Sequence, residues 1–148
     1  KISNAKPKIS DYPFTTLTPN LGIVKYGDFK SFVIADIPGI IKGASKGKGL
    51  GIQFLKHIQR TKILIFMVDI LSKEISKEYL TLKSELDKYD KSLNKKQSLL
   101  LITKSDTLSE KKIKKIKVPS SINSLIISSL NGSNVSEAVE KISKLTNK

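Results

Sequence analysis

The sequence lacks the features that would mark a disulfide-stabilised or membrane-embedded protein. Its 148 residues include no cysteine, so the fold does not rely on disulfides. No hydrophobic run approaches the roughly 20 residues that a membrane-spanning helix needs, and nothing in it resembles a secretory signal. These absences predict a single soluble domain in the cytoplasm, and we expect it to be a monomer without a membrane span.

Negative charge is scarce as well. The chain has 13 acidic residues against 27 basic ones, a formal net charge of +14 that would favour an anionic partner such as RNA or a nucleotide. Yet Arg60 is the only arginine, whereas a surface selected for two-pronged contacts with phosphates or bases usually has several. A biased composition and a functional basic face therefore remain two open explanations of the charge.

No Walker A loop occurs in the sequence. This loop, G-x-x-x-x-G-K-[S/T], cradles the β-phosphate of a nucleotide with backbone N–H groups and supplies a phosphate-binding lysine. Gly47-Lys48-Gly49 does not replace it, because it lacks both the spacing and the hydroxyl. The chain starts at Lys1 and its one methionine, Met67, lies well inside, so we expect a piece of a longer protein.

A glycine-rich segment at residues 36–51 carries the strongest chemical signal that is present. It follows the apolar run 32–35, which predicts that Asp36 stands at the carboxyl end of a strand. An acid in that place can hold Mg²⁺ through a water, and Gly39 lets the main chain approach a phosphate because it has no Cβ. An ordinary turn is the alternative.

Four motifs in order resemble the Obg family of GTPases. D-I-P-G-I-I-x-G-A-x-x-G-x-G-L-G, from Asp36, resembles its switch II, and residues 11–17 resemble its switch I. T-K-S-D at 103–106 and Ser128-Ser129 resemble its guanine-reading segments. The resemblance implies that residues 1–148 form one incomplete domain with an α/β, three-layer, P-loop-NTPase-like G-domain fold. Its sheet would be mostly parallel with one antiparallel edge hairpin, and would lack the first strand and the Walker A loop.

The resemblance also implies a function. The complete protein would bind GTP or GDP, hydrolyse GTP slowly with Mg²⁺, and act on the large ribosomal subunit or its rRNA during assembly. Ile40 stands where many small GTPases have a glutamine that orients the attacking water, so no catalytic residue is identified. Two alternatives remain open: a non-catalytic basic module that binds RNA or the ribosome, and a fragment without a function of its own.

By the same resemblance, individual residues are assigned to the nucleotide. Thr16, or Thr15 as the alternative, would share the Mg²⁺ ion with Asp36. Asp106 would accept two hydrogen bonds from guanine and so reject adenine, and Lys104 would lay its aliphatic stem along the base. The expected GTP-binding residues are Phe14, Thr15, Thr16, Asp36, Pro38, Gly39, Thr103, Lys104, Asp106, Ser128 and Ser129.

The hydrophobic pattern predicts where the helices and strands lie. Alternation predicts a hairpin from residues 20–26 and 30–35 around Gly27-Asp28. Apolar runs predict parallel strands at 63–69, 98–102 and 125–127, the first of them covered on both faces. Helical spacing predicts helices at 50–60, 73–89 and 135–145. Residues 109–117 are either a solvated helix with a narrow apolar stripe or an RNA-facing surface.

Overall fold

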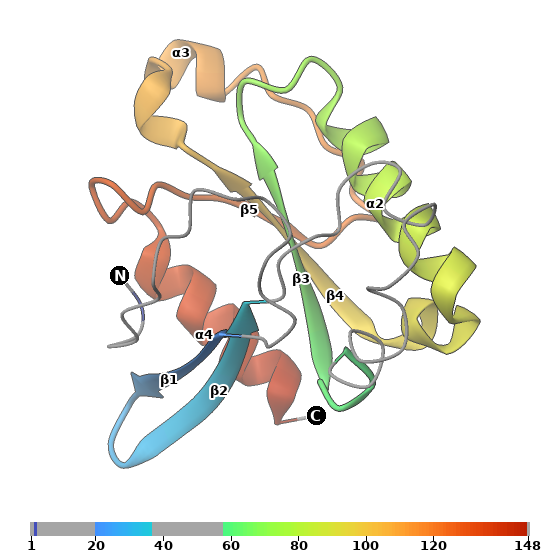
Figure 1. Cartoon of the computed structure of the whole chain (residues 1–148). Coiled ribbons are helices and arrows are strands. Elements are labelled where there is room, and N and C mark those ends of the chain that lie inside the picture. The colour runs from blue at the N-terminus through green and yellow to red at the C-terminus, as the bar shows by residue number, and fades with distance from the viewer. Residues whose placement is uncertain (1, 3–19, 37–57, 148) are drawn as a thin grey trace. The chain divides into compact units, whose positions relative to one another are not determined.

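The computed structural model describes residues 2, 20–36 and 58–147 (Figure 1). They fall into two compact units. The hairpin unit comprises residues 1–62 and 82–95, and the parallel-sheet unit comprises residues 63–81 and 96–148.

The hairpin unit contains two antiparallel strands, β1 (Asn20–Tyr26) and β2 (Lys30–Asp36), as the sequence predicts. Gly27 and Phe29 in the connecting turn have φ angles of 52° and 59°, the left-handed region that glycine enters without steric cost. The rings of Tyr26 and Phe32 lie diagonally across the two strands, tilted by 45° with centroids 5.6 Å apart, a cross-strand contact that helps to fix the register.

The parallel-sheet unit contains β3 (Ile63–Asp69), β4 (Gln97–Thr103) and β5 (Ser124–Ile126) in the order β3-β4-β5. Their apolar side chains supply the core of this unit, and Leu99, Leu100 and Ile102 of β4 are almost completely buried. The predicted parallel strands are therefore confirmed. Because the strands are parallel, their carboxyl ends lie at one edge of the sheet.

One strand differs from the expectation. Met67 near the end of β3 is 62% exposed, so β3 is not covered on both faces along its whole length. A near-continuous apolar run predicts a buried strand, but it does not say which of its residues a neighbouring element covers.

Two helices lie on opposite faces of the parallel sheet, α4 (Val135–Thr146) on one and the first half of α2 (Ile75–Tyr89) on the other (Figure 1). Tyr79 of α2 meets the Phe66 ring edge-on with centroids 5.1 Å apart, and its hydroxyl lies 3.1 Å from the Ser98 hydroxyl. α4 packs against β4 and buries Ala138 and Ile142. Helical spacing predicts both helices to within two residues.

Short helices complete the described chain: 3₁₀ turns at Lys91–Lys95 and Ser105–Thr107, and α3 at Glu110–Ile113. The helix predicted over residues 109–117 thus ends early. Lysines at positions 111, 112, 114, 115 and 117 place like charges three or four residues apart, which disfavours a continuous helix. The helix predicted at 50–60 falls mostly outside the described residues, where only its last residues, Ile58 and Gln59, are seen to be helical.

The predicted α/β class, with parallel strands and an antiparallel hairpin, is confirmed by these elements. Across the described ranges, no helix is both long and apolar enough to span a membrane.

Candidate functional site

Loops from all three parallel strands meet at the carboxyl edge of the sheet. The backbone N–H of Ile70, just after β3, donates to the Thr103 carbonyl at 3.0 Å. The N–H of Ser105, just after β4, donates to the Ile127 carbonyl at 3.1 Å. These bonds bring the T-K-S-D motif and the Ser128-Ser129 loop together, as the sequence predicts for a nucleotide site.

Asp106 is held by Ser128. The Ser128 side chain is completely buried, and its hydroxyl donates a hydrogen bond to the Asp106 carboxylate. The backbone N–H groups of Leu130 and Asn131 donate to the same hydroxyl oxygen at 3.1 and 3.3 Å. Because these amides occupy its acceptor side, the single hydroxyl proton is directed to the carboxylate. Asp106 itself stays exposed, with a fixed orientation.

The Ser128 hydroxyl thus has a role that the sequence did not predict, since Ser128 was expected only to bind the nucleotide itself. The Ser128 N–H instead donates to the Ser133 carbonyl at 3.0 Å. Of the two serines, Ser129 is therefore the one whose N–H is the better candidate for a base. In the sequence, only the position of a serine directly after a buried strand pointed to this contact. Serines at such positions are too common to identify a partner.

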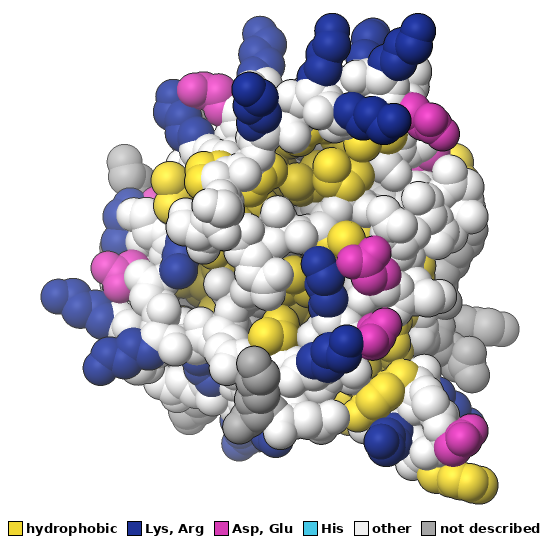
Figure 2. Space-filling model, turned by 180° about the vertical axis from the view of Figure 1, so that it is seen from behind, with side chains coloured by type: hydrophobic (Ala, Val, Ile, Leu, Met, Phe, Trp, Pro, Cys, Tyr) yellow, Lys and Arg dark blue, Asp and Glu magenta, His cyan; other side chains and the backbone are white. Residues whose placement is uncertain are grey.

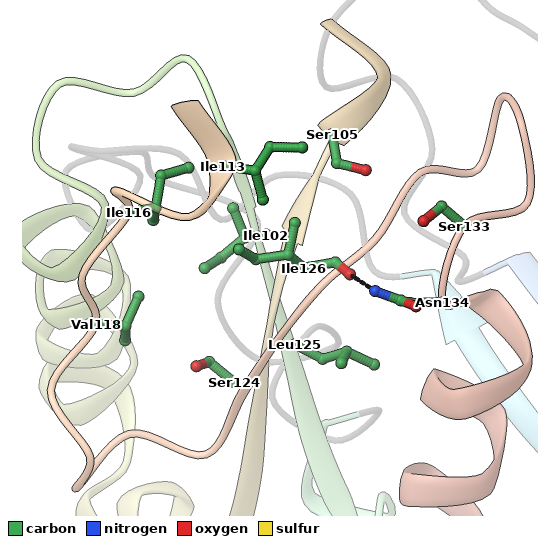
Figure 3. Close-up of a pocket in the computed structure, with 10 residues that line it drawn as sticks. All are labelled: Ile102, Ser105, Ile113, Ile116, Val118, Ser124, Leu125, Ile126, Ser133 and Asn134. Carbon is green, nitrogen blue, oxygen red and sulfur yellow. Dashed lines mark hydrogen bonds between the residues drawn. The ribbon is translucent and has the colours of Figure 1, made fainter. Parts of the chain in front are cut away.

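The loop after Ser128 is shaped by two residues with left-handed backbones. Gly132 has φ 86° and donates its N–H to the Ser128 carbonyl at 3.0 Å. Asn134 has φ 55°, and its side-chain amide donates to the Ile126 carbonyl at 2.9 Å (Figure 3). Glycine and asparagine are the residues that adopt this conformation at least cost. Hydrogen bonds from Gly132 and Asn134 thus hold this loop to Ser128 and to Ile126.

Lys104 has an ionic partner that the sequence analysis did not assign. Its ammonium lies 2.6 Å from Oδ2 of Asp69, the last residue of β3. The other oxygen, Oδ1, accepts the Leu71 N–H at 2.9 Å. The hydrogen bond from Lys104, and then that from Leu71, lowers the pKa of Asp69. Asp69 raises the pKa of Lys104, with a smaller contribution from Asp106. The sequence feature that could have indicated this ion pair is an apolar strand that ends in a carboxylate, Asp69.

Thr103 and Thr107 hold the backbone of the motif on either side of Lys104. The Thr103 hydroxyl donates to the Val68 carbonyl at 3.2 Å, which links β4 to β3. The Thr107 hydroxyl and N–H donate to the Lys104 carbonyl at 2.8 and 3.0 Å. Lys104 therefore keeps a left-handed backbone, with φ 63° and ψ 36°, which is uncommon for a residue with a side chain.

The remaining predicted site residues lie in the hairpin unit or outside the described residues. Asp36 is the last residue of β2, lies opposite Asn20, and is exposed within the hairpin unit. In the part of the chain that the structure describes, no group of three or more His, Cys, Asp or Glu residues could hold a metal ion. Five of the predicted residues lie outside the described residues: Phe14, Thr15, Thr16, Pro38 and Gly39.

A second surface lies around α3. Figure 2 shows lysine side chains gathered at the top of the molecule, where α3 lies, directly above exposed hydrophobic side chains. A pocket of about 460 Å³ opens beneath α3, as Figure 3 shows. Mostly apolar side chains line this pocket: Ile102, Ser105, Ile113, Ile116, Val118, Ser124, Leu125, Ile126, Ser133 and Asn134. We name the five exposed lysines, at 111, 112, 114, 115 and 117, the α3 lysine face.

Comparison with known proteins decides the family. Residues 1–104 match the family described as 50S ribosome-binding GTPases. The chain belongs to this family. It is 62% identical over 109 residues to GTPase Obg of Chlorobaculum tepidum, a match that covers 74% of the chain and 32% of that protein. It is 52% identical over 149 residues to GTPase Obg of Parabacteroides distasonis, covering 99% of the chain and 39% of that protein.

The resemblance to Obg proteins is thereby confirmed, and the chain spans less than half the length of these relatives. Solved structures agree on the fold of the family. Aquifex aeolicus Era bound to GDP.AlF4- matches with a TM-score of 0.66 at 24% identity, over 93% of the chain and 47% of Era. The G domain of T. maritima FeoB matches with a TM-score of 0.61 at 19% identity, over 97% of the chain and 86% of that domain.

Proposed function

We propose that this chain is the guanine-reading part of a single Obg-type G domain, and that the complete protein binds GTP and GDP and hydrolyses GTP slowly. The observation that carries the proposal is the exposed Asp106 carboxylate, oriented by the buried Ser128 hydroxyl at the carboxyl edge of the sheet. Membership of the 50S ribosome-binding GTPase family supports it.

The chemistry of Asp106 suits guanine. A carboxylate accepts two hydrogen bonds side by side, and guanine presents two adjacent donors, N1–H and the exocyclic amine. Adenine lacks this donor pair, so it leaves the carboxylate unsatisfied and binds poorly. The Lys104 stem would cover one face of the base, and Ser129 would offer its N–H to the guanine carbonyl.

The phosphate end of the nucleotide would be bound by other parts of the complete protein. A Walker A loop, absent from these 148 residues, would hold the β-phosphate. The exposed Asp36 carboxylate is a hard oxygen donor that fits Mg²⁺, and Thr16, Thr15 and the Phe14, Pro38 and Gly39 backbone would approach the γ-phosphate. Bound Mg²⁺ would neutralise charge on the phosphates during hydrolysis.

The large ribosomal subunit or its rRNA is the proposed macromolecular partner, and the cytoplasm the proposed compartment of a monomeric protein. The description of the family as 50S ribosome-binding supports this partner. The α3 lysine face and the net charge of +14 suit a polyanion. The same lysine face supports the alternative, a basic module that binds RNA without binding a nucleotide.

The test is an exchange of base preference in the full-length protein. Asp106→Asn should reduce GTP affinity at least about tenfold, because a charge-assisted hydrogen bond worth about 1.5–3 kcal/mol is lost. XTP affinity should rise, because xanthine has a carbonyl where guanine has its amine, and the new amide can donate to it. Competition of GTP and XTP for labelled nucleotide measures both affinities.

Asp87→Asn is a matched control, because the Asp87 carboxylate accepts a hydrogen bond from the Asn94 amide on the chain itself, at 2.7 Å. It should leave base preference unchanged. A variant at Asp106 that prefers GTP as strongly as the parent would refute the guanine assignment. A parent protein that binds RNA but neither GTP nor GDP would favour the alternative.

A further inference from the structure

The ion pair between Asp69 and Lys104 differs from an ordinary surface pair. Lys77 and Glu74, for comparison, lie three residues apart and are both largely exposed. Lys104 and Asp69 instead join the ends of two neighbouring strands, and the Asp69 side chain is 34% exposed whereas that of Lys104 is 64% exposed. Most exposed lysines sample many rotamers, so a lysine whose tip is held across strands has lost much of that freedom already.

Both partners are fixed by the backbone around them. The Leu71 N–H holds one oxygen of Asp69, which leaves the other directed to the Lys104 ammonium. The two hydrogen bonds from Thr107 hold the left-handed Lys104 backbone. The position of the four-carbon Lys104 stem is therefore determined at both ends, at its own Cα and at Asp69.

We propose that Asp69 is the positioning residue for the base-stacking lysine, a role that rests on the proposed function. It holds the ammonium so that the Lys104 stem lies in place before the nucleotide arrives, which lowers the entropy lost on binding. It also keeps this ammonium from pairing with Asp106. Lys104 and Asp106 attract each other, and such a pair would occupy the carboxylate that guanine needs.

The variant to make in the full-length protein is Asp69→Asn. Asparagine keeps an oxygen for the Leu71 N–H, so the turn survives while the negative charge is lost. GDP and GTP affinities should fall together, by about two- to tenfold, because both nucleotides carry the same base. The value of kcat at saturating GTP should stay unchanged, since Asp69 is not proposed to contact the phosphates.

Glu74→Gln is the matched control, because it removes an ion pair, with Lys77 at 2.8 Å, in which both side chains are largely exposed and which joins no two strands. It should change neither affinity nor kcat. Thermal unfolding without nucleotide should show similar midpoints for both variants. A variant at Asp69 that binds GDP as tightly as the parent would overturn the inference.

A double-mutant cycle shows whether Asp69 acts through Lys104. In a Lys104→Ala background, the Asp69→Asn change should cause no further loss of GDP affinity. Losses that simply add would mean that Asp69 acts by another route, and the inference would be wrong. If the parent bound no guanine nucleotide at all, the proposed function would be wrong as well. If the parent bound tightly but the two changes showed no coupling, only the positioning role of Asp69 would be wrong.

Discussion

At the residue scale, Asp69 and Ser128 hold the two side chains that we propose contact the base. Asp69 and Ser128 each contact a charged residue of the T-K-S-D motif and are themselves fixed by backbone N–H groups.

The Asp69–Lys104 pair persists over a wide pH range. The lowered pKa of Asp69 means that its contribution is lost only as the pH falls below the ordinary 3.8. The raised pKa of Lys104 means loss only above the ordinary 10.5. The pair is therefore not a switch near neutral pH.

Ser128→Ala in the full-length protein should lower GDP affinity about tenfold. The change removes a hydrogen bond to a charged group, worth about 1.5–3 kcal/mol, and leaves the Leu130 and Asn131 N–H groups without their acceptor. Fluorescent-GDP titration measures the loss. Ser136→Ala, an exposed position in the first turn of α4, is the control and should have no effect. Affinity within twofold of the parent would show that Asp106 needs no such support.

At the element scale, β4 organises the parallel-sheet unit. It is the middle strand, its residues 99–102 are buried, and it ends directly before Lys104 and Asp106. Because its buried side chains pack in the core of this unit, they fix the position at which the T-K-S-D motif leaves the sheet. Damage to this core should affect the site and the stability together.

Leu100→Ala should lower the free energy of unfolding by about 2–5 kcal/mol, because it opens a cavity at a completely buried position. Leu80→Ala is the control: Leu80 lies on α2 and is 57% exposed, so the expected change is within about 0.5 kcal/mol. Urea unfolding followed by circular dichroism compares the two variants of the 148-residue chain. Equal midpoints would mean that β4 is not the core of this unit.

At the scale of the whole molecule, the described strands form two separate sheets. β3 has a partner on one side only among these strands, so its other edge presents backbone N–H and C=O groups that no described strand pairs. We expect the isolated chain to be marginally stable, because no described strand completes the backbone hydrogen bonds on that side of β3. The sequence also contains no Walker A loop to bind the β-phosphate.

We therefore expect the isolated 148-residue chain to bind GTP weakly, with the full-length protein binding much more tightly. The reason is that the base-reading groups alone provide too few contacts, since the Walker A loop normally holds the phosphates. Titration of both proteins with labelled GTP and Mg²⁺ makes the comparison. Sub-micromolar, Mg²⁺-dependent binding by the isolated chain would contradict this expectation.

Sequence patterns alone were enough to predict the described strands, the hairpin turn, α2 and α4, and the motifs that carry the family resemblance. Apolar periodicity and turn residues are local signals, so β3, β4 and α4 were placed to within a few residues of their observed bounds. Local signals were insufficient for α3, which ends at Ile113. Like charges among the lysines at 111, 112, 114, 115 and 117 disfavour a longer helix, and two isoleucines alone favour it.

Which side chains meet at the site could be seen only in the folded chain. Asp69 faces Lys104 because the parallel register places Asp69 opposite Thr103, and the hydroxyl of Ser128 reaches Asp106 because β5 lies beside β4. Such contacts depend on register and strand order over separations of 35 and 22 residues. No periodicity in the sequence records them, since they arise only when distant strand ends share one edge of a sheet.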